Sequence, residues 1–254
     1  MNYSNMTSPP LHLSSVQTKY TVSPLSAAYL IHTRALGENS LIAELLTETN
    51  GRITVVANGA KRKNSLTKSM LQPFRPLLVS WRGLGDLKTM VRLEAPTLAL
   101  PLSSEYLYSG LYLNELVIRL LAKEQPHPEI YSSYHATLIA LSKQQDLEIC
   151  LRLFEFSLLK ELGHGFTLTH DNTGDPIQPD WQYQFDQEQG LMSKVAGKYN
   201  GHHLLAIAMQ NFCDKITRRQ AKLLAREALA PLLGNKPLHS RQLFMRRTTI
   251  IDKI

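Results

Sequence analysis

The 254-residue chain has few cysteines and no long apolar run, and both absences exclude classes of protein. Its two cysteines, Cys150 and Cys213, lie far apart and are too few for a disulfide framework. No apolar run approaches the roughly 18 residues that a membrane span needs. The Ser-, Thr- and Pro-rich start lacks the basic residues and apolar core of a secretory signal. We therefore expect a cytoplasmic protein with a flexible leader over residues 1–25 and no contact with a membrane.

Common catalytic and metal-binding motifs are also absent. There is no G-x-S-x-G, and "GLGDLKT" at residues 83–89 lacks the spacing of a phosphate-binding P-loop. Between residues 164 and 203 the spacing of the aspartates favours turns over a calcium loop, and the histidines lack neighbouring thiols. These polar residues are Asp171, Asp175, Asp180, Asp186, His164, His170, His202 and His203. We expect no metal, no cofactor and no enzymatic activity, with a metal-dependent hydrolase using residues 164–203 as an open alternative.

Positive charge is what the sequence has in excess, and it is unevenly distributed. The net charge is +7. Lys and Arg outnumber Asp and Glu by 11 to 5 in residues 1–100 and by 10 to 3 in residues 205–254, but residues 101–204 hold 7 against 13. Two basic ends around an acidic middle indicate two surfaces for a polyanion such as nucleic acid. The alternative is that the basic segments are ordinary solvated faces.

Residues 26–100 are predicted to form five strands and one short helix. Turn signals separate apolar segments at 27–36, 40–49 and 52–57, and two further strands are expected at 77–82 and 87–93. Between the third and fourth strands, Ser65 begins a segment with helical spacing. This order is typical of an OB barrel, which binds single strands or oligosaccharides, whereas the alternative SH3-like barrel lacks the helix.

From residue 101 the spacing of the apolar residues becomes helical. Amphipathic helices are expected at 103–124, 129–144, 147–163, 202–212 and 217–233. A polar, irregular insert with Asp, Gly and Pro interrupts them at about 164–201. The sequence therefore predicts an α+β protein, with an OB-fold domain at 26–100 followed by a mostly α-helical domain at 101–254.

Basic residues of the predicted barrel suggest a DNA-binding surface. The stretch "RITVVANGAKRKNS" at 52–65 ends a strand in three consecutive cations, and its glycine would let a phosphate approach the backbone. In the last strand, alternation predicts that Leu87 and Val91 point inward and that Lys88 and Arg92 point outward beside Arg82. Tyr29 and Trp81 are either stacking partners for bases or core residues, and the core is favoured. The predicted DNA-binding residues of the barrel are Arg34, Arg52, Lys61, Arg62, Lys63, Lys68, Arg82, Lys88 and Arg92.

A second basic cluster lies on the last long helix that the sequence predicts. Besides Lys215 and Arg219, it contains Arg218, Lys222 and Arg226, whose spacing of i, i+4 and i+8 forms one stripe. We predict that this stripe is a second DNA-binding surface. The alternative is the solvated face of a helix in a bundle.

Five blocks of the sequence, in order, resemble successive blocks of the RecO family of bacterial recombination mediators. They are "AAYLIHTRALGENSLIAELLTETNGRITVVANGAKRKNS", "LQPFRPLLVSWRGLGDLKT", "LPLSSEYLYSGLYLNEL", "LRLFEFSLLKELGHG" and "GNKPLHSRQLF". The resemblance runs from about residue 27 to about residue 246. It implies an N-terminal OB fold, a helical C-terminal domain, and binding of single- and double-stranded DNA. It also implies annealing of complementary strands without nucleotide hydrolysis.

The resemblance further implies protein partners and specific site residues. Family members bind RecR and help to load RecA onto DNA covered by single-stranded-DNA-binding protein (SSB), with the need for RecF left open. The position of a cation that binds the acidic SSB tail corresponds to Arg152 in "LRLFEF". Many relatives have a four-cysteine zinc site after the block "ELGHG", but this chain has "THDNTGD" there and we expect no zinc. The family's basic OB positions correspond to Arg34, Arg52, Lys61, Arg62, Lys63, Arg82 and Lys88.

A different polyanion would suit the same basic barrel. An OB-fold protein that binds RNA in translation or RNA decay would need the same cations, so this reading stays open beside the DNA-binding one. Competition between DNA and RNA would separate the two.

Overall fold

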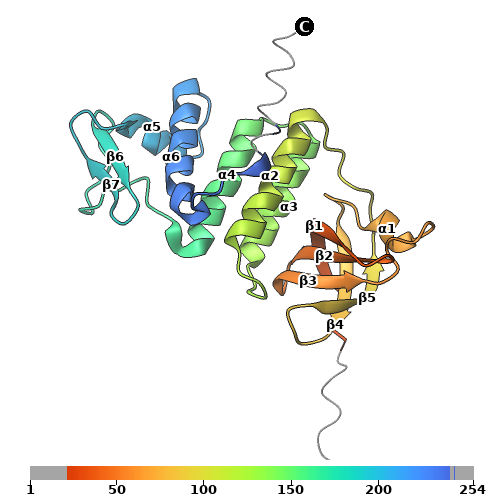
Figure 1. Cartoon of the computed structure of the whole chain (residues 1–254). Coiled ribbons are helices and arrows are strands. Elements are labelled where there is room, and N and C mark those ends of the chain that lie inside the picture. The colour runs from red at the N-terminus through yellow and green to blue at the C-terminus, as the bar shows by residue number, and fades with distance from the viewer. Residues whose placement is uncertain (1–21, 241–242, 244–254) are drawn as a thin grey trace, which may run out of the picture.

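The N-terminal part of the chain forms a closed five-stranded barrel in the order β1-β2-β3-β5-β4 (Figure 1). The computed structural model describes residues 22–240 and 243, so most of the predicted leader lies outside the described residues. A short helix, α1 (Leu66–Met70), connects β3 to β4, which confirms the predicted OB fold. The strands are β1 (Ser26–Leu36), β2 (Ser40–Thr47), β3 (Gly51–Ala57), β4 (Leu77–Arg82) and β5 (Lys88–Glu94).

Alternating apolar residues fill the barrel, as the period of two predicts. Ala43, Leu45 and Val55 are fully buried in its interior, and Trp81 is only 5% exposed. The hydroxyl of Ser65 accepts a hydrogen bond from the Lys68 backbone N–H at 3.3 Å, which gives α1 the N-cap that the sequence predicts. Trp81 is therefore a core residue.

A β-bulge in β5 reverses the predicted orientation of its first residues. Ser80 pairs with Arg92 and Trp81 with Met90, so Val91 has no partner on β4. The extra residue reverses the side of the sheet that each preceding side chain of the strand faces. As a result Leu87 and Val91 are each 49% exposed, while Lys88 is 7% exposed. The prediction that Leu87 and Val91 point inward and Lys88 outward is wrong.

The rest of the chain is mostly helical, as predicted. A wide helical turn at Lys160–His164 continues α4, and Gly163 within it has a positive φ of 78°. None of the described helices combines the length and apolar character needed to cross a membrane. The helices are α2 (Ser104–Leu120), α3 (Pro128–Ser142), α4 (Leu147–Leu159), α5 (Gly201–Ala208) and α6 (Lys215–Leu233).

The polar insert is a small antiparallel sheet in the order β7-β6-β8. Its strands are β6 (Gln182–Asp186), β7 (Gly190–Ser193) and β8 (Tyr199–Asn200). Tyr183, Leu191 and Tyr199 are buried against Leu224 of α6. Before the sheet, the carboxylate of Asp171 accepts hydrogen bonds from the N–H groups of Thr173 and Asp175 and from the Thr173 hydroxyl, at 2.9, 3.1 and 2.6 Å. This turn and the apolar cluster stabilise the insert.

The barrel and the first helices share one apolar core. Tyr29 and Leu46 of the barrel are fully buried with Tyr134 of α3. The Tyr29 hydroxyl and Nδ1 of His135 are 2.6 Å apart, and burial raises the pKa of Tyr29 to about 12. Tyr29 is therefore a core residue that joins the barrel to α3, which leaves it unavailable for stacking on a base.

Candidate nucleic-acid interface

Five exposed cations lie on β1, on the loop after β3 and on α1. This loop and α1 are at the edge of the barrel remote from α4, α5 and α6 (Figure 1). We call these five residues the loop cluster: Arg34, Lys61, Arg62, Lys63 and Lys68.

Hydrogen bonds hold the loop against the turn between β1 and β2. The backbone N–H of Lys61 donates to the Asn39 carbonyl at 3.0 Å, and its Nζ donates to the Gly37 carbonyl at 2.9 Å. Gly59 has a φ of 69°, which places the chain in a conformation that favours glycine. The Arg62 N–H closes the turn by donating to the Gly59 carbonyl at 3.1 Å. The loop therefore presents its cations from a defined backbone.

The charges of the loop cluster are not neutralised by neighbouring side chains. Within residues 22–240, no carboxylate lies within 4.0 Å of a cationic nitrogen of these five residues. Exposed, unpaired cations on one edge of a barrel attract a phosphodiester backbone and release its counterions. Prediction from sequence placed all five of these residues in the DNA-binding set.

Three other predicted barrel residues are held by carboxylates. Arg52 lies 3.2 Å from Glu44, and its side chain is 13% exposed. Lys88 is bonded to Glu124, and its side chain is 8% exposed. Arg92 is exposed but forms an ion pair with Glu94 at 2.6 Å.

Arg82 is exposed at the end of β4. The predicted cluster of outward-facing Arg82, Lys88 and Arg92 is therefore wrong for Lys88.

The predicted stripe on α6 also contains both carboxylate-bound and unpaired cations. Arg218 and Lys222 form ion pairs with Asp146 and Glu148 at 2.7 and 3.0 Å, and these pairs link α6 to the start of α4.

Arg226 is exposed, as are Lys215 and Arg219. Those three lie at i, i+4 and i+11 and so on one face of the helix. In the described part of the chain none of the three has a carboxylate within salt-bridge distance. The free cations of α6 are thus Lys215, Arg219 and Arg226.

Arg152 is buried, contrary to what its predicted role requires. It is 6% exposed, and its guanidinium donates to the Glu155 carboxylate one turn later on α4. The same carboxylate oxygen accepts a hydrogen bond from the Tyr112 hydroxyl at 2.7 Å. In this arrangement Arg152 neutralises the carboxylate that bonds α4 to Tyr112 of α2, and it offers no accessible charge to a peptide.

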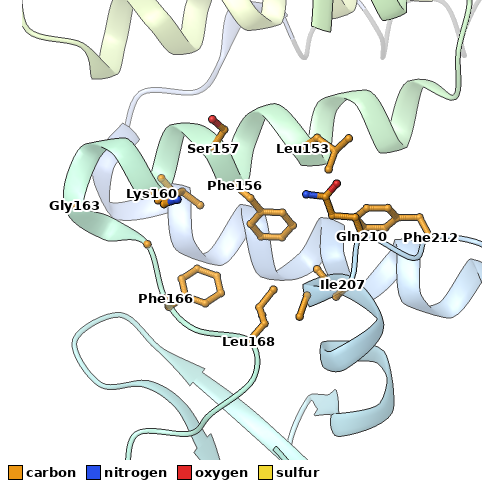
Figure 2. Close-up of a pocket in the computed structure, with 13 residues that line it drawn as sticks. Leu153, Phe156, Ser157, Lys160, Gly163, Phe166, Leu168, Ile207, Gln210 and Phe212 are labelled. Atoms are coloured by element: carbon orange, nitrogen blue, oxygen red, sulfur yellow. The ribbon is translucent and has the colours of Figure 1, made fainter. Parts of the chain in front are cut away.

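An apolar pocket lies beside α4, and the sequence analysis did not identify it. Its volume is about 610 Å³. Leu153, Phe156 and Lys160, at i, i+3 and i+7, form one wall, with Phe166 and Phe212 among the other lining residues (Figure 2). The spacing along α4 indicates one helix face, but only the tertiary structure brings Phe166 and Phe212 to it.

The acidic and histidine residues of the insert include two turn-forming aspartates, and Nδ1 of His203 lies 2.8 Å from the Thr217 hydroxyl of α6. The carboxylate of Asp186 accepts hydrogen bonds from the N–H groups of Glu188 and Gln189, both at 2.9 Å, and these bonds lower the pKa of Asp186. Among the described residues no group of three His, Cys, Asp or Glu side chains has the arrangement of a metal site. Turn formation accounts for Asp171 and Asp186.

Comparison with known proteins assigns the chain to a family. Residues 25–96 match the model "Recombination protein O N terminal", and residues 102–242 match "Recombination protein O C terminal". The chain is 40% identical over 233 residues to the DNA repair protein RecO of Haemophilus influenzae strain Rd, which covers 90% of this chain and 99% of that protein. It is 42% identical over 221 residues to the RecO of Actinobacillus pleuropneumoniae serotype 5b, which covers 85% of this chain and 92% of that protein. The chain therefore belongs to the RecO family of DNA repair proteins.

Proposed function

We propose that the protein is a non-enzymatic recombination mediator that binds DNA, anneals complementary single strands and helps to load a recombinase onto SSB-coated DNA. The observation that carries this proposal is the loop cluster, with five exposed cations on an OB barrel and no carboxylate paired with them in the described residues. Phosphate contacts of this kind supply affinity without reading sequence. Membership of the RecO family supports DNA as the polyanion.

Annealing follows from charge neutralisation and positioning. Two single strands repel each other, and cations that bind their phosphates screen this repulsion. The loop cluster would hold one strand, and Lys215, Arg219 and Arg226 on α6 would hold the other or its duplex product. Complementary bases would then meet more often, with no covalent bond made or broken.

The pocket beside α4 is the proposed binding site for the acidic SSB tail. Its apolar wall suits an aromatic side chain, and Lys160 supplies an exposed cation at the pocket. Arg152 would act indirectly, because it neutralises Glu155, whose bond to Tyr112 of α2 holds the helix that forms this wall. RecR and RecA are proposed partners on the basis of the family, and a RecF-dependent route is left open.

The experiment that tests the proposal is annealing of SSB-coated complementary oligonucleotides. The double variant Arg62→Glu/Lys63→Glu removes two phosphate contacts and leaves Lys61 bonded to Gly37. We expect its affinity for single-stranded DNA to fall at least about tenfold at low salt, with a matching loss of annealing rate. The control Lys143→Glu/Lys194→Glu changes net charge equally at exposed lysines of the helical part.

Two results would contradict the proposal. Equal binding by the double variant and its control would remove the loop cluster from the interface. Preferential binding of an RNA oligonucleotide in direct competition would instead favour the RNA-binding alternative.

A further inference from the structure

A small basic pocket, which we call the α6 pocket, lies at the C-terminal end of α6. Its volume is about 170 Å³. Arg226, Ala230 and Leu233, at i, i+4 and i+7, form its helical wall, and residues 234–238 form the rest. The described residues that line it include the cations Arg226 and Lys236 but no Asp or Glu. The α6 pocket is therefore a concave site with positive charge.

The two cations of the α6 pocket are unpaired. Arg226 and Lys236 are both exposed, and no carboxylate within residues 22–240 lies within 4.0 Å of their side-chain nitrogens. Glu227, which follows Arg226 in the chain, is bonded to Lys198 instead. The charge of both cations is thus available to an anion from outside.

The loop that closes the pocket adds backbone donors. Gly234 has a φ of 59°, which favours glycine, and its N–H donates to the Pro231 carbonyl at 3.2 Å. The next two N–H groups, of Asn235 and Lys236, have no acceptor among the described residues. Successive backbone N–H groups in a turn form concavities that bind anions. The side-chain amide of Asn235 is a further donor at the same place.

Contacts with α2 and with the core hold this loop in place. Arg119 of α2 donates to the carbonyls of Leu233 and Lys236, the latter at 2.8 Å. Leu238 is 2% exposed and packs in the core that the barrel shares with the first helices. The C-terminal end of a helix repels anions, but here the Arg119 guanidinium lies against its carbonyls and offsets their partial charge. The pocket is therefore formed before a ligand binds.

The α6 pocket continues a row of cations along the helix. Lys215, Arg219 and Arg226 share one exposed face, and Lys236 follows beyond the end of the helix. At a rise of 1.5 Å per residue, Lys215 and Arg226 are about 16 Å apart along the helix axis. Figure 1 places α4 between α6 and the barrel, so this row is a surface separate from the loop cluster.

We propose that the α6 pocket binds a backbone phosphate of the second DNA strand during annealing. The inference rests on the proposed DNA-binding function and extends its α6 surface to the residues that follow the helix. Phosphate oxygens accept charge-assisted hydrogen bonds from Arg226 and Lys236 and further bonds from the loop N–H groups. A phosphate anchored at the end of the row fixes how the second strand lies along α6, while the loop cluster holds the first strand.

The test separates annealing from the binding of one strand. Arg226→Gln/Lys236→Gln removes both cations of the pocket, and its control Lys143→Gln/Lys194→Gln changes net charge equally at exposed lysines elsewhere. At low salt we expect the annealing rate to fall about fivefold to tenfold in the pocket variant and to stay within about twofold of native in the control. The affinity for one short oligothymidylate should stay within about twofold of native in both variants, because the loop cluster binds it.

Two results of this test would overturn the inference. Annealing by the pocket variant at the rate of its control would show that the α6 pocket holds no strand. Equal losses of annealing rate and of affinity for one oligonucleotide would show that the pocket belongs to the site of the first strand.

A second measurement uses the native protein, so it does not depend on how a variant folds. As oligothymidylate is added, the amide NMR signals of Asn235 and Lys236 should shift when the second equivalent binds, after those of Lys61 and Arg62. No shift of the Asn235 and Lys236 signals would contradict the inference. Inorganic phosphate is the competing probe: if it shifts these signals at the same concentration of phosphate groups, the pocket is a site for free phosphate and the assignment to DNA is wrong.

The failure of this inference can be told apart from that of the proposed function. If Arg62→Glu/Lys63→Glu weakens binding while Arg226→Gln/Lys236→Gln anneals like its control, only the α6 pocket is wrong. If Arg62→Glu/Lys63→Glu binds like its own control, the proposed interface itself is wrong.

Discussion

At the scale of single residues, two side chains of α2 fix the segment that follows α6. The Glu115 carboxylate accepts hydrogen bonds from the N–H groups of His239 and Ser240, both at 2.8 Å, and from the Ser240 hydroxyl at 2.6 Å. Arg119 donates to the Leu233 and Lys236 carbonyls, and so caps a helix whose own last turn has no basic residue. Burial raises the pKa of Glu115, but the hydrogen bonds from Ser240 and His239 outweigh it and leave the pKa below 4.5.

Loss of the Glu115 charge should weaken this attachment. Because the folded-state pKa is lowered, the stabilisation is present above the unfolded value of 4.5 and is lost as the pH falls through the lower folded value. Glu115→Gln should lower the free energy of unfolding by about 1–2 kcal/mol at neutral pH. Urea unfolding of both proteins from pH 7 to pH 3 should show this difference shrinking as the pH falls. A difference that is constant with pH would mean that the charge is not responsible.

At the scale of elements, α4 has two distinct faces. One face buries Phe154 and Leu158 with the Arg152–Glu155 ion pair, and the other forms the wall of the apolar pocket. A substitution on α4 should therefore affect either stability or binding, according to the face on which it lies. Figure 2 shows the pocket between α4 and the residues of the following loop and α5.

Substitution of Lys160 should lower the affinity for an acidic peptide that ends in phenylalanine, whereas substitution of Arg152 should lower the stability of the fold. Lys160→Glu should weaken binding by about 1 kcal/mol and leave stability unchanged, since the residue is exposed. Arg152→Ala should lower the free energy of unfolding by about 3 kcal/mol, because it leaves the Glu155 carboxylate buried without its cation. Peptide titrations and urea unfolding of both variants measure this. A stable Arg152→Ala protein that has lost only peptide affinity would show that Arg152 contacts the tail directly.

At the scale of the whole molecule, ion pairing decides how many of the cationic side chains are available to contact DNA. The sequence predicts twelve DNA-binding cations, but Arg52, Lys88, Arg92, Arg218 and Lys222 are each bonded to a carboxylate. The unpaired ones include the five residues of the loop cluster. Three of these carboxylates, Glu124, Asp146 and Glu148, belong to the acidic middle, so its folding against the basic ends cancels part of the charge segregation along the chain.

The salt dependence of binding measures how many cations contact DNA. Five phosphate contacts predict a slope of about −3.5 for the logarithm of the binding constant against the logarithm of salt concentration, and all twelve predict about −8. We expect the smaller value for the native protein with an oligonucleotide long enough to cover the barrel, measured between low and moderate salt. A slope near the larger value would show that the ion pairs open on binding.

Local signals account for most of what could be predicted. The barrel order, the Ser65 cap and the exposed Lys61–Lys63 loop depend on neighbouring residues, whose alternation and turn chemistry are visible in the sequence. The β-bulge at Val91 was missed because no neighbouring glycine or proline marks it. The pocket beside α4 was missed because its walls come from three separate segments.

The sequence by itself determined an OB barrel followed by helices and where its cations occur along the chain, because hydrophobic periodicity and turn residues act over a few positions. Only the tertiary structure decided which cations are free. The carboxylate that neutralises Lys88 is 36 residues away, and the one that neutralises Lys222 is 74 residues away. The electrostatic energy of a side chain depends on the distance and burial of such partners, and folding alone sets both.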